Sequence, residues 1–182
     1  MSMAWRCRRA LFMGRFQPFH LGHYNALKWI VERESEVVLA IGSAQYSHSL
    51  RNPFTVGERL EMVYAVLREE GLLDRVLVTV VPDTDGQHSL WVKLVVSFSP
   101  CFDVVYTNDP LSRMLFEEEG FKVESIPFYE REKYEGTRIR RLMAEGGDWA
   151  QYVPPAVAEV IRRIHGEQRV RSLFYLEAGG KN

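Results

Sequence analysis

The sequence predicts an α/β fold in which a parallel sheet is followed by C-terminal helices. Short apolar runs alternate with helical patterns over the first two thirds of the chain, and the runs are continuously apolar, as in strands buried on both faces. Beyond residue 136 only helical patterns remain. A chain of 182 residues is long enough for one real core, so we expect a single domain over residues 1–182.

The predicted elements alternate regularly along the chain. Thr55, with Glu58 three residues later, has the pattern of a capping box at a helix start. Gly71 and Gly120 are typical helix stops. We expect a disordered tail from about residue 177 to residue 182. Strands are predicted over 10–13, 36–42, 75–81, 103–107 and 122–126, and helices over 24–31, 56–70, 89–97, 108–119, 137–145, 155–164 and 168–176.

Composition excludes several classes of function. The formal net charge is -1, so no overall basic field favours nucleic-acid binding. No apolar run is long enough to cross a membrane, and the run after the basic start is too short for a signal peptide. We therefore expect a cytoplasmic protein without a membrane partner.

The two cysteines, Cys7 and Cys101, lie far apart in the sequence. Neither has a histidine or cysteine neighbour at a metal-binding spacing. We expect two reduced thiols, with neither a disulfide nor a zinc site.

Residues 14–23, GRFQPFHLGH, connect the first predicted strand to the first helix. His20 and His23 are three residues apart at the helix entrance, so their side chains lie on one side of it. A helix N-terminus presents unpaired N–H groups, which suit phosphate. On spacing alone the histidines could be phosphate donors, metal ligands or a structural pair, although two histidines without a third ligand make a poor metal site.

A second basic segment covers residues 136–141, where Thr137 begins a predicted helix. A cation near a helix N-terminus interacts unfavourably with the helix dipole, so the positions of Arg138, Arg140 and Arg141 require an explanation. An anionic ligand supplies one, and a solvated basic face is the alternative. Arg138 and Arg141 share a helix face with Arg140 to one side, so the three do not all serve one phosphate.

Polar side chains also follow the other predicted strands. Because ligands bind at the carboxyl ends of parallel strands, we expect the loops there to come together. Arg51 could contribute to a site or be a solvent-exposed loop arginine, and Trp91 could be core or could stack on an aromatic ring. The candidates in these loops are Ser43, Arg51, Asp83, Asp85, His88, Trp91, Thr107 and Asn108.

Three segments together resemble a known family. GRFQPFHLGH at 14–23 resembles the HxGH signature of the nucleotidyltransferase superfamily, and residues 136–140, GTRIR, resemble its second signature. Residues 41–59, IGSAQYSHSLRNPFTVGER, are closer to one branch, the archaeal nicotinamide-nucleotide adenylyltransferases. The similarity continues to residue 149 in the same order.

This resemblance implies a Rossmann-like doubly wound sheet and transfer of AMP from ATP to nicotinamide mononucleotide (NMN), giving NAD and pyrophosphate. It also implies Mg²⁺ held mainly by phosphates rather than by protein ligands, and a hexamer. It assigns catalysis to His20, His23 and Arg140. It assigns ATP binding to these three with Gly14, Arg15, Phe16, Thr107, Asn108, Thr137 and Arg138, and NMN binding to Gln17, Ser43, Arg51, Asp83, His88 and Trp91.

The chain departs from the family at His88, where members have asparagine. The loop at 83–88 is also one residue longer, so either Asp83 or Asp85 could contact the acceptor. Nicotinate mononucleotide, flavin mononucleotide and phosphopantetheine are alternative acceptors for the same chemistry. A non-catalytic nucleotide sensor is an alternative of another class.

Overall fold

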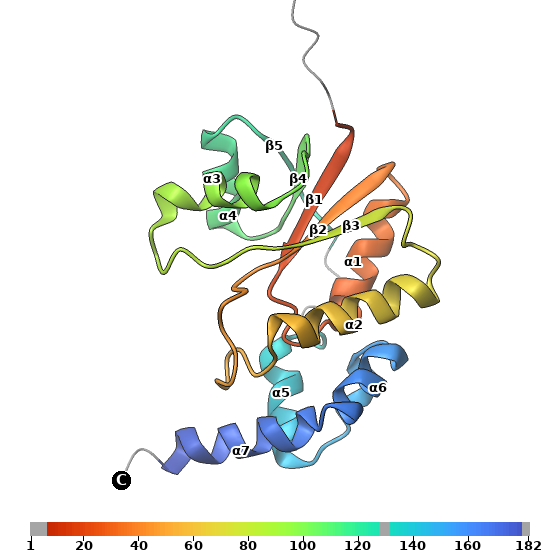
Figure 1. Ribbon diagram of the computed structural model, residues 1–182, viewed down its shortest axis with the longest axis vertical. Coiled ribbons are helices and arrows are strands. Elements are labelled where there is room, and N and C mark those ends of the chain that lie inside the picture. The colour runs from red at the N-terminus through yellow and green to blue at the C-terminus, as the bar shows by residue number, and fades with distance from the viewer. Residues whose placement is uncertain (1–6, 128–131, 180–182) are drawn as a thin grey trace, which may run out of the picture.

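The computed structural model describes residues 7–127 and 132–179. Its centre is a five-stranded sheet in the order β3-β2-β1-β4-β5 (Figure 1). Every neighbouring pair is parallel. The strands are β1 (Arg9–Gly14), β2 (Glu36–Ile41), β3 (Val76–Val80), β4 (Val104–Tyr106) and β5 (Lys122–Glu124).

β1 lies between β2 and β4, and the strand order reverses there. Gly14 pairs with Ile41 on one side, while Phe12 pairs with Tyr106 on the other. The chain leaves β1 toward β2 and leaves β4 toward β5, in opposite directions, so the loops after β1 and β4 diverge. In open α/β sheets such a reversal creates a crevice at the carboxyl ends of the strands, where ligands bind.

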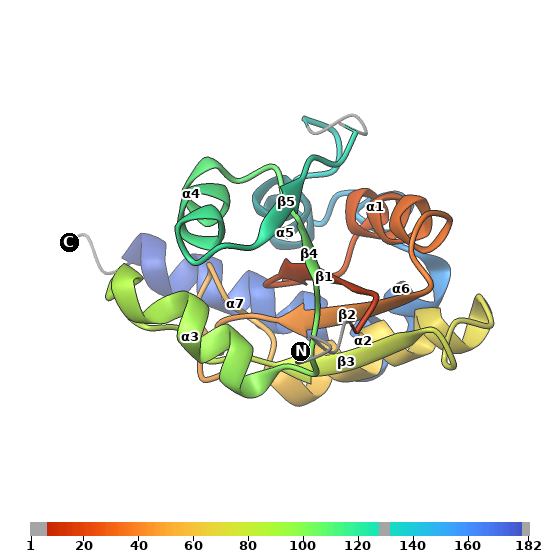
Figure 2. The ribbon, with the colours of Figure 1, turned by 90° about the horizontal axis from the view of Figure 1, so that it is seen from above.

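Two helices cover each face of the sheet (Figure 2). Helices α1 (Leu21–Val31) and α2 (Val56–Glu69) lie on one face, and α3 (His88–Phe98) and α4 (Pro110–Glu118) lie on the other. Alternate β1 residues enter opposite cores, with Ala10 and Phe12 in one and Leu11 in the other. Burial on both faces explains why these strands are apolar without interruption.

The C-terminal helices form a separate group below the sheet in Figure 1. They are α5 (Gly136–Glu145), the short 3₁₀ helix η1 (Ala150–Tyr152), α6 (Pro155–Arg163) and α7 (Gly166–Gly179). Helix α6 packs against α2, and α7 packs against α5. These contacts place the start of α5 near the loop that follows β1, where the Arg140 guanidinium donates to the Gln17 carbonyl at 2.8 Å.

The Rossmann-like parallel fold that the sequence predicts is confirmed. Helix α1 begins at Leu21, three residues earlier than expected, because the preceding histidine caps it. The expected disordered tail is wrong for residues 177–179, which belong to α7, and its remainder lies outside the described residues. Along the described chain, no helix combines the length and the apolar character needed to cross a membrane.

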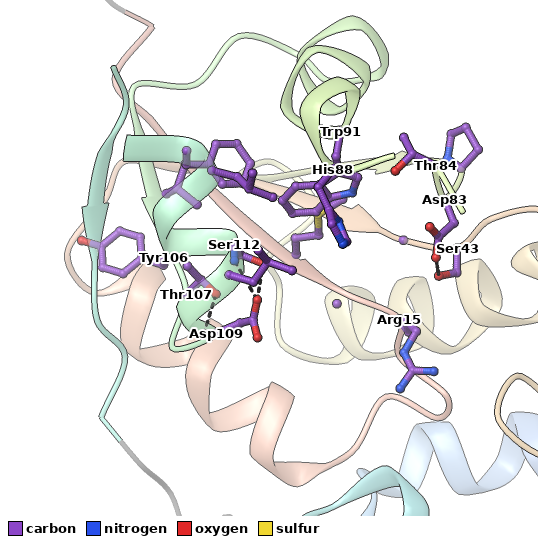
Figure 3. A pocket seen from close by; sticks show the side chains of 18 of the residues that line it. Arg15, Ser43, Asp83, Thr84, His88, Trp91, Tyr106, Thr107, Asp109 and Ser112 are labelled. Carbon is purple, nitrogen blue, oxygen red and sulfur yellow. Dashed lines mark hydrogen bonds between the residues drawn. The ribbon is translucent and has the colours of Figure 1, made fainter. Parts of the chain in front are cut away.

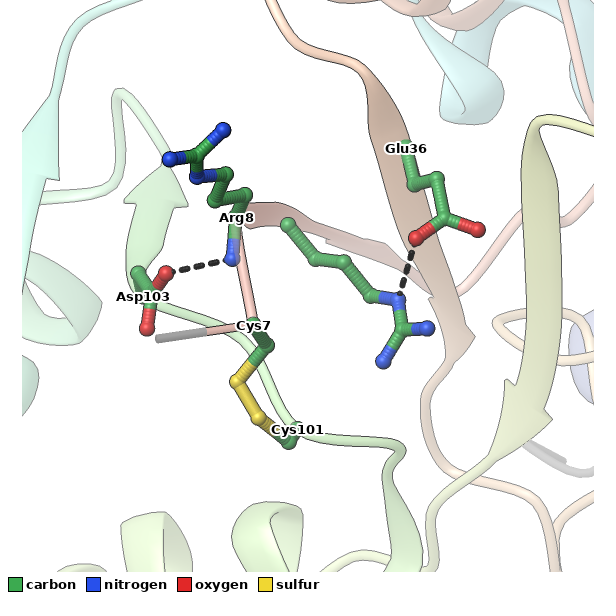
Figure 4. The surroundings of a disulfide bond; sticks show 6 residues. Cys7, Arg8, Glu36, Cys101 and Asp103 are labelled. Atoms are coloured by element: carbon green, nitrogen blue, oxygen red, sulfur yellow. Dashed lines mark hydrogen bonds and ion pairs between the residues drawn. A yellow bond between two sulfur atoms is a disulfide. The ribbon is translucent and has the colours of Figure 1, made fainter. Parts of the chain in front are cut away.

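The expectation of two reduced thiols is wrong, because Cys7 and Cys101 form a disulfide (Figure 4). Cys7 precedes β1 and Cys101 precedes β4, its direct neighbour in the sheet. Parallel neighbours begin at the same edge, so the two Cα atoms lie 5.9 Å apart despite a sequence separation of 94 residues. The Asp103 carboxylate next to the bond also accepts the backbone N–H of Arg8 at 2.6 Å.

Removing this bond is expected to destabilise the fold. A disulfide limits the freedom of the unfolded chain and typically contributes about 2–4 kcal/mol. We expect Cys7→Ser, Cys101→Ser and the double variant to lower the free energy of unfolding in urea by the same amount, because each loses the same bond. Reductant should lower the stability of the wild type similarly and leave the variants unchanged. Two results would contradict this expectation. One is a loss in the double variant equal to the sum of the two single losses, and the other is equal stability of the wild type and all three variants without reductant.

Candidate functional site

Two cavities open at the carboxyl edge of the sheet, one on each side of Arg15. The Trp91 pocket has a volume of about 440 Å³, and its lining includes Arg51. Its lining also includes Ser43, Asp83, His88 and Trp91 (Figure 3). The histidine pocket, of about 450 Å³, is lined by residues that include His20, His23, Asn108 and Gly136. Arg15 and Thr107 line both cavities. Ligands in the two pockets would therefore meet beside Arg15.

His20 and His23 form a reciprocal cap at the start of α1. The backbone N–H of His23 donates to Nδ1 of His20 at 3.4 Å, and the backbone N–H of His20 donates to Nδ1 of His23 at 3.2 Å. The two rings stack with centroids 3.6 Å apart. A neutral imidazole that accepts at Nδ1 carries its proton at Nε2. Both histidines thus keep one N–H donor that the cap does not use.

Close packing fixes the orientation of these rings. The buried ring of Phe16 meets the His23 ring edge-on, with centroids 4.8 Å apart. A Cβ atom on Gly14 would lie 2.8 Å from the Phe16 ring, and a Cβ atom on Gly22 would lie 3.0 Å from the His20 ring. Glycine is therefore required at both positions for this arrangement, which explains the glycine between the two histidines.

Both histidines are neutral at physiological pH. Burial and the charge of Arg140 lower the pKa of His20 to about 4. Burial, His20 and Arg15 lower the pKa of His23 well below its usual value. Each ring in this state offers an Nε2–H donor and carries no positive charge.

The positive charge comes from arginines. Burial, followed by the charge of Arg51, lowers the pKa of Arg15, while Asp83 partly opposes this. Burial and the charges of Arg15 and Arg51 lower the pKa of Arg140 to about 10, so its guanidinium remains protonated. The positive charges of Arg15, Arg51 and Arg140 repel one another. A bound anion reduces this repulsion, so the arrangement favours an anionic ligand.

Arg140 is itself incompletely satisfied. Its Nη1 donates to the carbonyl of Gln17 at 2.8 Å and its Nη2 to the hydroxyl of Thr137 at 3.3 Å. Its Nε is buried and has no hydrogen-bond partner within the described ranges. The guanidinium lies against Gly136, where a Cβ atom would come within 2.9 Å of Nη1. Arg140 lines neither pocket, but Gly136, against which its guanidinium lies, lines the histidine pocket, so the cation lies just behind that wall.

The wall of the Trp91 pocket contains a hydrogen-bonded pair of loops. The Ser43 hydroxyl donates to the Asp83 carboxylate at 3.1 Å. The side-chain amide of Gln45 bonds the backbone N–H and C=O of Asp83 at 2.8 and 2.9 Å. Asp85 does not line the pocket and instead accepts from the hydroxyl of Tyr46. The structure therefore places Asp83, and not Asp85, where a ligand could reach it.

Trp91 belongs both to the pocket and to the core. Its ring packs edge-on against Phe116 with centroids 5.3 Å apart, while the side chain also lines the cavity. His88, the first residue of α3, lies beside Trp91 at the pocket mouth (Figure 3). An aromatic face next to a polar side chain suits a flat heteroaromatic ring with a polar substituent.

Some predicted contact residues have other partners. The amide of Gln17 is buried and bonds both backbone groups of Phe54, at 2.9 and 3.0 Å. The Asn108 amide lines the histidine pocket but bonds both backbone groups of Ile126, at 2.7 and 2.9 Å. Arg138 lies over the Tyr152 ring, 5.1 Å from its centroid, and lines neither pocket. Gln17 and Asn108 thus tie neighbouring loops together through their amides, and Arg138 packs on Tyr152.

One buried cation, Arg59, was not singled out as a candidate. It is fully buried in α2 and bonds backbone carbonyls of the loops after β1 and β2. The sequence does contain a signal for it. Arg59 occupies the first position of the buried stripe at residues 59, 62, 63, 66 and 67, where the other residues are apolar. Arg140 stands in a similar buried stripe on α5.

The described part of the chain contains no cluster of three or more histidine, cysteine, aspartate or glutamate side chains that could hold a metal ion. The pocket linings combine the cation Arg15 and the neutral histidines with separate carboxylates, those of Asp83, Asp109 and Glu135. The cation and the histidines suit phosphate, and a divalent cation that arrives bound to phosphate.

Comparisons with known proteins identify relatives of this chain. The cytidylyltransferase-like family matches residues 11–142. A nicotinamide-nucleotide adenylyltransferase from Archaeoglobus fulgidus is 50% identical over 169 residues, which cover 91% of this chain and 97% of the relative. A protein of the same name from Methanothrix thermoacetophila is 48% identical over 166 residues, which cover 91% and 96% of the two chains.

A solved structure shares the fold. It is the bifunctional NMN adenylyltransferase/ADP ribose pyrophosphatase from Francisella tularensis, complexed with AMP and a manganese ion. The TM-score is 0.74 at 21% sequence identity, and the match covers 90% of this chain. The present chain spans about half, 52%, of that protein. The family and the fold that the sequence motifs predicted are both confirmed.

Stability is expected to fall with acidification because of the capping histidines. The pKa of His20 is about 4 in the folded state, compared with about 6.5 in the unfolded chain. Between pH 4 and pH 6.5 the unfolded chain therefore binds a proton at His20 more readily than the folded protein does. The contribution of His20 is complete above pH 6.5 and is lost as the pH falls toward 4, by about 3 kcal/mol.

Asparagine can cap a helix without titrating, so His20→Asn should reduce this loss of unfolding free energy. Urea unfolding from pH 7 to pH 4 measures the slope for both proteins. Equal slopes would show that His20 does not carry the lowered pKa.

Proposed function

Because the chain belongs to the nicotinamide-nucleotide adenylyltransferase family, we propose that it transfers AMP from ATP to NMN, forming NAD and pyrophosphate. The observation that carries the proposal is the pair of pockets on either side of Arg15, at the point where the strand order reverses. Two nucleotides bound there would bring their phosphates together among neutral N–H donors and arginines.

The histidine pocket takes ATP in this proposal. The Nε2–H groups of His20 and His23 donate to its phosphates, and Arg140 approaches from α5. Arg15, Thr107 and Asn108 line this pocket, and Gly14 lines the neighbouring Trp91 pocket. Thr137 accepts from Arg140 through its hydroxyl, and Phe16 packs against His23.

NMN occupies the Trp91 pocket, with its pyridine ring on Trp91 and its amide near His88 and Asp83. Arg51, an exposed residue on the pocket wall, binds the phosphate of NMN. Ser43 fixes the Asp83 carboxylate through its hydroxyl. Gln17 acts indirectly, by tying the loop after β1 to Phe54.

The reaction needs no general base. A phosphate monoester has a second pKa of about 6, so the NMN phosphate is largely a dianion at neutral pH. One of its oxygens attacks the α-phosphorus of ATP in line, a new P–O bond forms, and the bond to the bridging oxygen breaks. Pyrophosphate leaves with the electron pair. The protein supplies positioning and charge stabilisation, through donors that are already oriented before the substrates bind.

Magnesium enters with the nucleotide as part of the substrate. Mg²⁺ prefers oxygen ligands and is commonly held by substrate phosphates together with water. Arginines and neutral N–H donors near both pockets would hold the phosphates that carry the ion. A cytoplasmic location and a hexameric assembly remain predictions, and light scattering in solution measures the assembly.

The activity is tested by pyrophosphate release with Mg²⁺, ATP and each of four acceptors in turn. We expect release with NMN, and the appearance of NAD in equal amount. Nicotinate mononucleotide, flavin mononucleotide and phosphopantetheine are the comparison acceptors. Binding of ATP without pyrophosphate release would indicate a nucleotide sensor, and a higher rate with flavin mononucleotide or phosphopantetheine would contradict the assigned acceptor.

Two arginines on one helix provide a matched comparison. Arg140→Ala removes the cation beside the phosphates, and loss of one such donor typically lowers kcat by about 10²–10³, or about 2.7–4 kcal/mol. Arg138→Ala removes the same side chain two residues away, where it lies on Tyr152, and should change kcat less than about threefold. Steady-state rates, with folding checked by circular dichroism, decide the matter. Equal losses in both variants would remove Arg140 from the phosphate site.

A further inference from the structure

We propose that Arg59 is a positioning residue for adenylyl transfer, whose guanidinium fixes the distance between the two nucleotide pockets. This inference rests on the proposed function. Arg59 belongs to the first turn of α2 and touches neither pocket. Its effect would therefore pass through the backbone that it holds.

The Arg59 side chain joins three segments of the chain. Its Nη1 donates to the carbonyls of Arg15 at 2.9 Å and Gly42 at 2.7 Å, and its Nη2 donates to the carbonyl of Ser43 at 3.1 Å. Its Nε donates to the carbonyl of Thr55 at 3.3 Å. A single planar group thus binds the loop after β1, the loop after β2 and the start of α2.

The residues that Arg59 holds carry side chains of the site. Arg15 lines both pockets, and Ser43 fixes the carboxylate of Asp83 in the Trp91 pocket. A shift of the β1 loop relative to the β2 loop would move Arg15 relative to Asp83. The separation of the pockets therefore depends on a group that binds both loops at once.

Hydrogen bonds also fix the first turn of α2, which bears Arg59. Thr55 and Glu58 form the capping box of α2, in which the Glu58 carboxylate accepts the Thr55 backbone N–H at 2.9 Å. Arg169 of α7 binds the same carboxylate through both terminal nitrogens, at 2.6 and 2.7 Å. Helix α7 therefore anchors the turn that bears Arg59.

The choice of partners is unusual for a fully buried charge. Arg59 makes no ion pair with a carboxylate in the described part of the chain, although buried charges are normally paired. Burial and the charge of Arg15 lower its pKa to about 10, so it still carries charge at neutral pH. A fork of donors aimed at carbonyls orders the backbone, and lysine cannot reproduce that geometry with a single ammonium group.

Two substitutions separate geometry from charge. Arg59→Lys keeps the positive charge and loses the planar fork, while Arg59→Met keeps much of the volume and loses both. Arg75 provides the matched control, because its guanidinium also donates to three backbone carbonyls, those of Val31, Glu34 and Ser35. It lies just before β3, at the opposite edge of the sheet from the pockets.

The assay is pyrophosphate release at saturating ATP and NMN, at a temperature where each protein is folded. A misplacement of about 1 Å between reacting groups can cost about 10²-fold in rate, so we expect both Arg59 variants to lose about 10–100-fold in kcat. KM for each substrate should change less than about threefold, because each pocket retains its own contacts. Arg75→Lys and Arg75→Met should lower the melting temperature and leave kcat within about twofold.

Several outcomes would overturn the proposal. Wild-type kcat in Arg59→Lys would show that charge alone suffices, and an equal loss of kcat in the Arg75 variants would indicate a general effect of stability. If neither Arg59 variant folds at the lowest assay temperature, Arg59 is a folding residue and not a positioning residue. Absence of pyrophosphate release by the wild type would instead overturn the proposed function, and this inference with it.

Discussion

The reciprocal cap between His20 and His23 is the interaction on which the site depends. It satisfies two backbone N–H groups at the start of α1, and it requires both rings to be neutral with Nδ1 free to accept. The remaining Nε2–H groups are then fixed donors, oriented before any ligand arrives. Because neutral rings add no charge, the proposed attraction for phosphate comes from Arg15, Arg51 and Arg140. The histidines thus cap the helix and offer neutral donors, while the arginines carry the positive charge.

The fold and the location of the site could be predicted from the sequence because both depend on local patterns. Continuous apolar runs predict strands buried on two faces, and a helix-capping pattern such as that of Thr55 and Glu58 is confined to a few residues. The rule that ligands bind at the carboxyl ends of parallel strands then brings Ser43, Asp83 and Thr107 to one edge. The family motifs added the identity of the chemistry.

Features that depend on which strands become neighbours could not be predicted in the same way. The Cys7–Cys101 bond follows from the pairing of β1 with β4, which no local pattern reveals. The partners of Gln17 and Arg138 likewise depend on side-chain contacts across the fold. Arg59 was detectable in principle, because a charge in an apolar stripe indicates a buried contact, but its carbonyl partners lie in loops distant in the sequence.

His20 and His23 are neutral and protonated at Nε2, and in the proposed reaction they donate to phosphate. A long-range ¹H–¹⁵N NMR spectrum of the histidine rings at neutral pH, recorded with and without pyrophosphate and Mg²⁺, measures this directly. We expect both rings to be Nε2–H tautomers, and we expect pyrophosphate to shift their Nε2 signals while both Nδ1 nitrogens remain unprotonated. Imidazolium rings, Nδ1–H tautomers or Nε2 signals that ignore pyrophosphate would contradict this expectation.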